Sequence, residues 1–378
     1  MEFVLSHEQT HLKDTVQRYC REHYSFRDRQ KNLRSNGGLD PSHWEAFATF
    51  GWLGVVLPEN IGGHGGSIID MAIILEEFGR SLVLEPYLFA AVLASQAIGI
   101  AAEPTQAREL LDPLVRGVSI LALAHQEPRN TQGVRGGLGT TARVRPDGDF
   151  ILQGRKTLVL GGDQANRFLV SAQVSGQGKD TDGVSLFLVD RAAPGLSIRN
   201  YRMLDGRGAA DLQLSGTPVP SDAELATNGT SLMALDRATD WAIVGLCAEA
   251  LGSMDSVIST TIAYLKMRRA GGSPLSEYQA LQHRIADMVA EREMARSILH
   301  AALAAFSSGA GDCIRQATST AKAIVGAAGT FIAANGIQLH GAAGMVDDYI
   351  IGQQFKRLTV VEALFGNSDF HLSRRLQL

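Results

Sequence analysis

The spacing of hydrophobic positions changes twice along the chain. Over residues 1–117 these positions recur every three or four residues, as they do on one face of a helix. Over residues 118–226 short runs rich in Val, Leu, Ile and Phe are separated by turn residues, which is typical of strands. Over residues 227–378 the helical spacing returns. The pattern predicts an α+β protein with a helical N-terminal domain, a middle β domain and a helical C-terminal domain.

Local signals mark where the N-terminal helices begin and end. Ser6 and Gln9 form a capping box ahead of the first helix. Asp40-Pro41 is a start signal for a second helix, because a capping side chain is followed by a proline in the first turn. Gly79 is expected to end a third helix, which contains MAIILEEFGR.

The middle domain carries a strong hairpin signal. Asp147-Gly148 separates two β-like runs, TTARV and FILQGRKTLVL, and this dipeptide suits a tight turn between antiparallel strands. The runs RFLVSAQV, GVSLFLVD, GLSIRNYRML and AADLQL follow, each bounded by turn residues. Short strands at this spacing predict a small β-barrel or sandwich. Strands and helices do not alternate, so a nicotinamide-binding Rossmann sheet is not expected.

Three mostly apolar stripes run along the C-terminal domain at helical spacing. They are Val244, Ala248, Leu251, Asp255, Ile258, Ile262 and Leu265; Tyr278, Leu281, Ile285, Met288 and Leu299; and Ala321, Ile324, Ala328, Phe331 and Asn335. Gly326, Gly329 and Ala333 flank the third stripe and would let a neighbouring helix come close. Long helices of this kind predict an antiparallel four-helix bundle.

Composition narrows the class of protein. A hydrophobic fraction of 45% and a charged fraction of 20% are typical of a soluble globular protein. A net charge of −4, with no dense Lys/Arg cluster, argues against a nucleic-acid-binding protein. The longest uncharged run, residues 86–102, is shorter than a membrane span, and the N-terminus lacks the features of a secretory signal. A cytoplasmic protein without a membrane span is expected.

The cysteines and histidines do not form a metal-binding pattern. Cys20, Cys247 and Cys313 are isolated, and we interpret them as buried small residues in a reducing compartment. His283 and His340 lack the additional ligands that a metal site needs, so we interpret them as hydrogen-bonded structural residues. No metal is expected.

The stretch QLHGAAGMVDDY, residues 338–349, follows the third stripe with two glycines around two alanines. Gly341 and Gly344 suggest backbone that something large approaches closely. The alternative is an ordinary helix end followed by a turn. A second glycine-rich stretch, GGHGG at 62–66, lacks the Lys-Ser/Thr of a phosphate-binding P-loop, so we interpret it as a structural loop.

Several stretches, taken in order, resemble the acyl-CoA dehydrogenase family, and the resemblance covers essentially the whole chain. They are LPENIGGHGG, ILEEFGRSL, ALAHQEP, LQGRKTLVLGGDQANRFLVSA, LDGRGAADLQL, RRAGGSPLSEYQALQHRIADM and QLHGAAGMVDDY. Each motif alone is a weak signal, whereas their common order argues against chance. The resemblance implies the family's domains over 1–117, 118–226 and 227–378, FAD as the cofactor and an acyl-CoA thioester as the substrate.

The same resemblance implies where FAD binds. In the family, the loop after the third of these helices crosses a subunit interface to the adenosine–pyrophosphate end of a neighbour's FAD. Gln338, Gly341 and Ala342 take that place here, and Arg268 matches the arginine that meets the pyrophosphate. A guanidinium suits a diphosphate because it offers paired donors and a fixed charge. Gln279 matches a glutamine near the same end of the cofactor.

The family's chemistry needs a carboxylate base that removes the α-proton while the β-hydrogen leaves as hydride to the flavin. In many members a glutamate follows, at a fixed spacing, the arginine beyond the glycine loop. Counted from Arg357, that spacing falls on Gly366. Glu362 and Asp369 are nearby but out of register.

Other members place the base at the start of the first bundle helix. The corresponding positions are near Ala242 and Ile243, with Asp240 and Glu249 as the nearest acids. No residue takes the catalytic role by position, so the catalytic residue stays unknown.

Further departures concern the flavin ring and the nucleotide. The family's VTEPGAGSD is HQEPRNTQG at 125–133, and its K-WIT strand is KTLVL at 156–160. Leu158 and Leu160 thus replace groups that contact a polar ring system. The aromatic residue of the family's R-QFG is Gly271 here.

These departures lead to the hypothesis of a heteromeric enzyme. The tail EALFGNSDFHLSRRL resembles the small-subunit group of heteromeric bacterial members, such as pimeloyl-CoA dehydrogenase and the enzymes that shorten steroid side chains. This chain would be the small or degenerate subunit of a heterotetramer. A partner chain would supply the base, and an electron-transferring flavoprotein would accept the electrons.

Three alternatives stay open. A homotetrameric dehydrogenase could use a displaced base at Glu362, Glu249 or Asp240. A structural subunit could lack flavin and only complete a partner's FAD and acyl-CoA site. A different flavoenzyme, such as a nitroalkane oxidase or a flavin monooxygenase, could use the same fold. The acyl group is equally open between dicarboxylyl, steroid and medium-chain thioesters.

Overall fold

The structure is a computed structural model, and it describes residues 4–35, 38–128, 138–174, 183–225, 230–309 and 311–376. The packing of Cα atoms divides the chain into two compact units. The first contains residues 1–34, 68–83 and 243–378, and the second contains residues 35–67 and 84–242. The three sequence domains stay a prediction, because this packing groups the chain differently.

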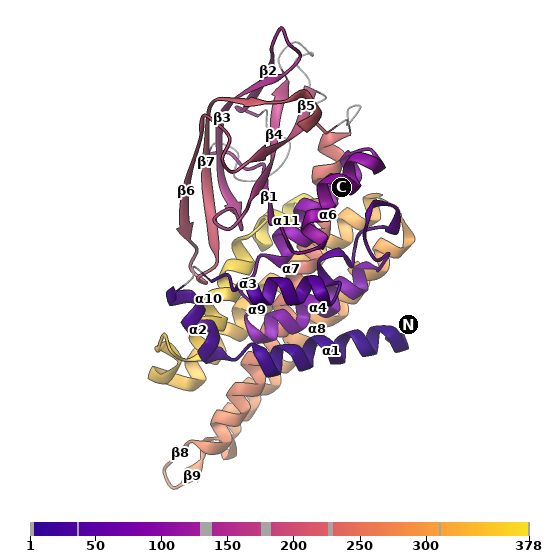
Figure 1. The fold of residues 1–378 in the computed structure, drawn as a ribbon. Coiled ribbons are helices and arrows are strands. Elements are labelled where there is room, and N and C mark those ends of the chain that lie inside the picture. The colour runs from indigo at the N-terminus through magenta and orange to yellow at the C-terminus, as the bar shows by residue number, and fades with distance from the viewer. Residues whose placement is uncertain are drawn as a thin grey trace. The chain divides into compact units, whose positions relative to one another are not determined.

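The first unit is helical, apart from one short hairpin. Its helices are α1 (His7–His23), α2 (Phe26–Ser35), α4 (Ile68–Ser81), most of α7 (Ser231–Met267), α8 (Gln279–Ser308), α9 (Gly311–His340), η7 (Gly341–Met345), α10 (Ile350–Ala363) and α11 (Ser368–Leu376). The hairpin of β8 (Arg269–Ala270) and β9 (Ser273–Pro274), followed by η6 (Leu275–Glu277), joins α7 to α8 (Figure 1). Helix α9 packs along α8, α10 and α11, as expected for a bundle.

The second unit combines short helices with the large sheet. The helices are α3 (Pro41–Thr49), η1 (Trp52–Gly54), η2 (Glu59–Ile61), η3 (Leu88–Ala94), α5 (Ser95–Ala101), α6 (Pro104–Val115), η5 (Ser221–Ala223) and the start of α7. The strands are β1 (Leu121–Ala124), β2 (Thr141–Val144), β3 (Phe150–Leu160), β4 (Arg167–Val174), β5 (Val184–Asp190), β6 (Leu196–Arg202) and β7 (Gly208–Val219).

The sheet of the second unit has the order β1-β4-β2-β3-β7-β6, with β5 paired to β4 (Figure 1). The expected hairpin is confirmed, because β2 and β3 are antiparallel and the amide of Gly148 donates to the carbonyl of Arg145. Strands β1 and β2 both run parallel to β4, which the sequence did not indicate. One face carries a core that includes Ala122, Ala124, Leu152, Phe168, Val170, Phe187 and Leu212.

The apolar run at 86–102 forms a buried helix, as expected, but its first half is π-helical. This half, η3, packs against β1. Helix α7 is long and apolar enough to cross a membrane, yet 94% of its most apolar window is buried inside the protein. Its composition is therefore that of a core helix.

The first helix begins as predicted, whereas the third ends later than expected. Ser6 and Gln9 make both capping-box hydrogen bonds, each 3.1 Å long. Helix α4 runs through Gly79 to Ser81, so the prediction that Gly79 ends it is wrong. A Cβ on Gly79 would lie 1.9 Å from the carbonyl oxygen of Glu249 in α7. This glycine is needed for a close helix crossing, and a glycine in a helical run indicates either use equally.

The prediction that all three cysteines are buried is confirmed for two of them. Cys20 and Cys247 are buried, but Cys313 is exposed in the first turn of α9, so the prediction of three buried thiols is wrong there.

The glycine-rich loop at 62–66 is structural, because its amides donate to backbone carbonyls within the same segment of chain. Those of Gly63, His64, Gly65 and Gly66 donate to the carbonyls of Pro58, Gly54, Leu57 and Val55.

We expect Gly79→Ala to lower the free energy of unfolding by about 1–3 kcal/mol, the usual penalty for overpacking a core. The methyl group would meet backbone, which cannot turn away as a side chain can. In the control Gly99→Ala, the Cβ would meet only side-chain tips, those of Ile61 at 3.1 Å and Leu57 at 3.9 Å, so a smaller loss is expected. Urea titrations of both variants measure the difference, and equal losses would contradict the interpretation.

Candidate functional site

The five residues predicted to bind the cofactor lie at helix ends in the first unit. Arg268 directly follows α7, and Gln279 is the first residue of α8. Gln338 lies in the last turn of α9, and Gly341 and Ala342 begin η7. All five are exposed in this chain.

Contacts between these helices bring the ends together. The hydroxyl of Tyr264, one turn before Arg268, lies 3.4 Å from the carbonyl of His340, and the two rings are 4.4 Å apart. Arg284, near the start of α8, donates to Asn335 near the end of α9 at 3.4 Å. The end of α7, the start of α8 and the end of α9 therefore meet at one end of the unit.

The two glycines of the 338–349 stretch play different roles. Gly341 has a φ of +60°, and no atom lies within 4 Å of the position that a Cβ would take. Gly341 ends the helix in the left-handed conformation, and it also leaves open space beside the backbone. The interpretation as a helix end and the interpretation as approachable backbone therefore both apply to it. Gly344 is buried, and a Cβ there would lie 3.1 Å from the carbonyl of Ile337. The expectation of open backbone is wrong for Gly344, which is small for internal packing.

Polar contacts hold the segment after η7 in place. The carbonyl of Asp347 accepts from Gln30 of α2 at 2.9 Å, and its carboxylate pairs with Lys356 of α10 at 2.7 Å. Asp348 pairs with Arg34 of α2 at 2.6 Å. The segment at Asp347 and Asp348, which follows the exposed backbone of Gly341 and Ala342, is therefore held by both α2 and α10.

The hairpin beyond α7 holds the backbone of Arg268. The carbonyl of Arg268 accepts from the amide of Leu275 at 2.8 Å. The hydroxyl of Tyr278 donates to the carbonyl of Ala270 at 2.8 Å and would lie 3.0 Å from a Cβ on Gly271. Tyr278 thus covers Gly271. The guanidinium of Arg268 makes no ion pair within the ranges that the structure describes.

The acids near the expected base positions are mostly engaged within the protein. Glu249 and Arg357 are each 1% exposed, and their side chains form two hydrogen bonds of 2.9 and 2.6 Å. One oxygen of Glu362 accepts from the amide of Ser368 at 2.8 Å. Asp240 is buried at 4% exposure, whereas Asp369 is exposed.

The turn between α10 and α11 is held by a buried lysine and a buried histidine. Lys322 donates to the carbonyls of Glu362 and Gly366 at 3.0 and 2.8 Å. His371 lies 3.0 Å from the carbonyl of Phe365, so this ring nitrogen must donate. Burial and the nearby charge of Lys322 lower the pKa of His371 to about 4, so the ring is neutral at pH 7.

Gly366 occupies a backbone conformation that favours glycine. Its φ is +101°, and a Cβ there would lie 2.2 Å from the ring of Phe370. At the alternative position for the base, Ala242 and Ile243 are buried and apolar. The structure therefore has no carboxylate at either expected position.

In the second unit, sequence reasoning missed a buried polar cluster. Lys156 of β3 donates to Glu127 at 2.7 Å and to Ser171 of β4 at 3.1 Å, and His125 lies 2.8 Å from the Ser171 hydroxyl. Burial lowers the pKa of Lys156 to about 8 against the opposing effect of Glu127. The Glu-Pro and Lys of the motifs were visible in the sequence, but not that strand pairing joins them. Residues 129–133 of HQEPRNTQG lie outside the described residues.

Strand β3 is irregular beside this cluster. Its pairing with β7 shifts between Lys156 and Val159, and Leu158 has a φ of +49°, which is unusual for a residue with a side chain. Asp211 of β7 accepts from the amide of Leu158 and from Arg155 and Arg199. These hydrogen bonds stabilise the bulge.

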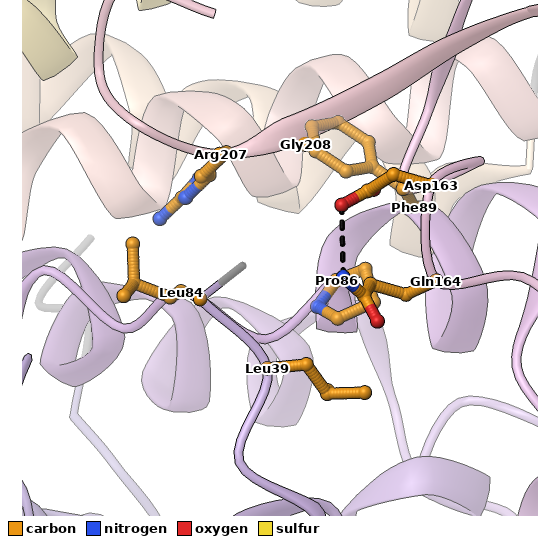
Figure 2. A pocket seen from close by; sticks show the side chains of 10 residues that line it. Leu39, Leu84, Pro86, Phe89, Asp163, Gln164, Arg207 and Gly208 are labelled. Carbon is orange, nitrogen blue, oxygen red and sulfur yellow. Dashed lines mark hydrogen bonds between the residues drawn. The ribbon is translucent and has the colours of Figure 1, made fainter. Parts of the chain in front are cut away.

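A pocket in the second unit is too small for a substrate. Figure 2 shows the carboxylate of Asp163 hydrogen-bonded to Gln164, with Arg207 lying away from them. The free space is about 10 Å³, which is room for about one water molecule. A Cβ on Gly208 would lie 1.8 Å from the Asp163 carboxylate, so a side chain there would displace this carboxylate. None of the lining residues is among the five predicted for the cofactor.

Three family models match the chain in order. The acyl-CoA dehydrogenase N-terminal domain matches residues 6–118, the middle domain matches residues 122–216, and the C-terminal domain matches residues 234–375. The chain belongs to the acyl-CoA dehydrogenase family. Its members are FAD-dependent oxidoreductases that act on acyl-CoA, so the expected family, fold and cofactor are confirmed.

Individual relatives match almost the whole length of this chain. The acryloyl-CoA reductase (NADH) of Anaerotignum propionicum is 25% identical over 376 residues, which are 98% of this chain and 94% of the relative. A solved steroid ACAD, Tcur3481-Tcur3483, is 30% identical with a TM-score of 0.85 over 98% of this chain and 97% of its own. The ChsE4-ChsE5 complex from Mycobacterium tuberculosis shares the fold, with 22% identity and a TM-score of 0.88 over 100% of this chain and 98% of its own.

One end of the first unit carries exposed groups of the kinds that bind a dinucleotide. Arg268 offers a guanidinium that no described acid neutralises, and Gly341 offers open backbone. Gln279 and Gln338 add exposed amide groups. The assignment of these residues to FAD stays a prediction.

We expect Arg357→Leu to lower the free energy of unfolding by about 3–5 kcal/mol, because it leaves the buried Glu249 carboxylate without its guanidinium. The double variant Glu249→Leu/Arg357→Leu should be clearly more stable than this single variant. Arg34→Leu, which breaks an exposed pair, should lose about 0–1 kcal/mol. Urea titrations measure all three, and similar losses for Arg357→Leu and Arg34→Leu would contradict the prediction.

The lowered pKa of His371 predicts acid sensitivity. Between pH 6.5 and about 4 the unfolded chain binds a proton at this histidine while the folded chain does not. This contribution to stability is therefore present above pH 6.5 and is lost as the pH falls, by about 1.4 kcal/mol per pH unit at most. His371→Gln should show a shallower dependence of unfolding free energy on pH, and identical slopes would refute the prediction.

Proposed function

We propose that this chain is the subunit lacking a catalytic base in a heteromeric FAD-dependent acyl-CoA dehydrogenase. The observation that carries the proposal is Gly366, which stands in the family's register for the base. Its φ of +101° is strained for any residue with a side chain, and a Cβ there would lie 2.2 Å from the ring of Phe370, which would have to move. A partner chain of the same family would supply the carboxylate.

The acids near the alternative positions are poor substitutes for the base. Both oxygens of Glu249 are already bonded to Arg357, and opening this pair would leave two buried charges uncompensated. Glu362 caps the start of α11 through the amide of Ser368. These contacts favour the heteromer over a homomeric enzyme with a displaced base.

The helix ends of the first unit support a role for this chain in holding FAD. Bound FAD would supply hydride acceptance from the β-carbon of the acyl group. Arg268 would neutralise the diphosphate, while Gln338 and the backbone at Gly341 and Ala342 would bind the adenosine side. Gln279 would lie beside them at the start of α8. Exposure of all five in the isolated chain is consistent with a cofactor that lies between subunits.

Two of the related structures carry names that fit this assembly. The Tcur3481-Tcur3483 steroid ACAD and the ChsE4-ChsE5 complex are each named after two chains. By analogy we propose a second acyl-CoA dehydrogenase chain as partner, in a heterotetramer, with an electron-transferring flavoprotein as acceptor. A structural subunit without flavin is less consistent with the unneutralised Arg268.

The test is coexpression with a candidate partner from a neighbouring gene, followed by measurement of FAD per chain and of acyl-CoA oxidation. We expect bound FAD and activity in the complex, and no activity from this chain alone. In the complex, Arg268→Leu should weaken FAD binding by about tenfold or more, as for loss of one charged hydrogen bond. Lys266→Leu removes the same charge two residues away and should leave FAD binding unchanged.

Two results would refute the proposal. One is full flavin occupancy with acyl-CoA oxidation by this chain alone. The other is equal FAD affinity in Arg268→Leu and Lys266→Leu, which would remove Arg268 from the cofactor site.

A further inference from the structure

Helix α9 exposes large apolar side chains on the side that its neighbours in the bundle do not cover. Ile324 is 36% exposed and Phe331 is 40% exposed. Ala327 and Ala334 lie on the same side of the helix and are exposed as well. The opposite side faces the core of the unit, where Ile332 is fully buried. Helix α9 therefore has two apolar sides, and the described part of the chain covers one of them.

The exposed side of α9 has the spacing of a helix–helix contact. Its residues follow one another at alternating intervals of three and four, and we call them the α9 stripe: Ala317, Thr320, Ile324, Ala327, Phe331 and Ala334. The first two are half-buried and the other four are exposed. An interval that averages 3.5 residues is that of positions a and d in a coiled coil, where each side chain inserts between side chains of the facing helix. The stripe therefore fits a second helix.

The α9 stripe lies in a segment without charge. Residues 323–338 include no Asp, Glu, Lys or Arg, and the side chain of Lys322, which precedes them, is fully buried. A soluble surface usually carries charges at about a quarter to a third of its positions. The centres of protein–protein interfaces, in contrast, are depleted in charge. An uncharged face can meet its own copy without like-charge repulsion, whereas a charged face needs a partner of opposite sign.

The order of large and small residues makes the α9 stripe complementary to itself. Positions a and d are, respectively, Ala317, Ile324 and Phe331, and Thr320, Ala327 and Ala334. When two such helices run antiparallel, the a positions of one lie opposite the d positions of the other. Pairing over the whole stripe then places Ile324 opposite Ala327 of the second copy, and Phe331 opposite Thr320 of the second copy. Each large side chain meets a small one across a twofold axis, as close packing in an isologous dimer requires. A parallel pair would instead place Phe331 against Phe331.

We propose that the α9 stripe joins two copies of this chain through an antiparallel contact with twofold symmetry. The inference goes beyond the proposed function, since it needs neither FAD nor a partner chain. In the proposed heterotetramer, it supplies the contact between like chains that joins two heterodimers. The stripe ends at Ala334, one turn before Gln338, so this contact leaves the helix ends of the candidate site free.

The test uses two forms of this chain with different affinity tags, coexpressed with each other and with the partner chain. Capture of one tag and detection of the other measures the contact between copies, and light scattering gives the mass of the assembly. Ala327→Glu and Ile324→Lys each place a charge in the α9 stripe. Ala301→Glu changes an exposed alanine of α8, outside the stripe, and is the matched control. Circular dichroism checks that each variant is folded.

We expect the unmodified copies to be captured together. Ala327→Glu in both copies should raise the dissociation constant of the contact between copies about a hundredfold or more, because the twofold axis places two charges in an apolar contact. The partner chain should stay bound. Ile324→Lys in both copies should have the same effect, and Ala301→Glu should have none. Ala327→Glu in one copy and Ile324→Lys in the other should restore joint capture, because antiparallel pairing brings the two opposite charges together.

Joint capture that persists in folded Ala327→Glu would overturn the inference. Release of the partner chain while the two copies stay together would overturn it as well, because the stripe would then bind the partner. Loss of capture without recovery in the mixed pair of variants would overturn the antiparallel pairing. If no complex with a partner chain forms, the proposed function fails, whereas capture between copies of this chain alone still decides the present inference.

Discussion

The buried pair of Glu249 and Arg357 is the interaction on which the first unit depends. Two charges at 1% exposure are tolerated only because their geometry is bidentate, with hydrogen bonds of 2.9 and 2.6 Å. The pair joins α7 to α10 across 108 residues of sequence. Helix α10 is preceded by η7 and followed by the turn at Gly366, so the same pair determines where both of these segments can lie.

Glycines complete this arrangement where helices must approach one another closely. A Cβ on Gly79 or Gly252 would lie less than 2 Å from a backbone carbonyl of the opposite helix, at 1.9 and 1.7 Å. Gly326 similarly makes room for the carboxylate of Glu362. Because the helices lie this close, polar side chains of one helix can reach the backbone or side chains of the next. The same close packing fixes the relative positions of the helix ends that form the candidate site.

The sequence predicted those features whose causes are local. The capping box of Ser6 and the hairpin at Asp147-Gly148 depend on a few adjacent residues, and both are present. The roles of Gly79 and Gly344 could not be predicted, because a glycine permits a turn, a close crossing or an open backbone, and only its neighbours in space decide which. The parallel pairing of β1 with β4 and the π-helical turn of η3 also depend on packing between distant segments.

The candidate site was predictable to a similar extent. The order of the motifs predicted which residues lie at the ends of α7, α8 and α9. It could not predict the contacts that bring these ends together, such as that of Tyr264 with His340. The cluster around Lys156 could not be predicted either, because its members are 15 to 31 residues apart from that lysine and meet only through strand pairing. Spacing also could not reveal that Glu249 is committed to an ion pair.

The turn at Gly366 has an evolutionary consequence. A single codon change to a charged residue there would create a strained backbone and a steric clash with Phe370 before it could restore any chemistry. An acid at this site would therefore need compensating replacements nearby, above all at Phe370, before its side chain could be accommodated. A chain that relies on a partner subunit for its carboxylate would therefore not easily become independent of that partner. The genes for the two subunits would then be expected to be inherited together.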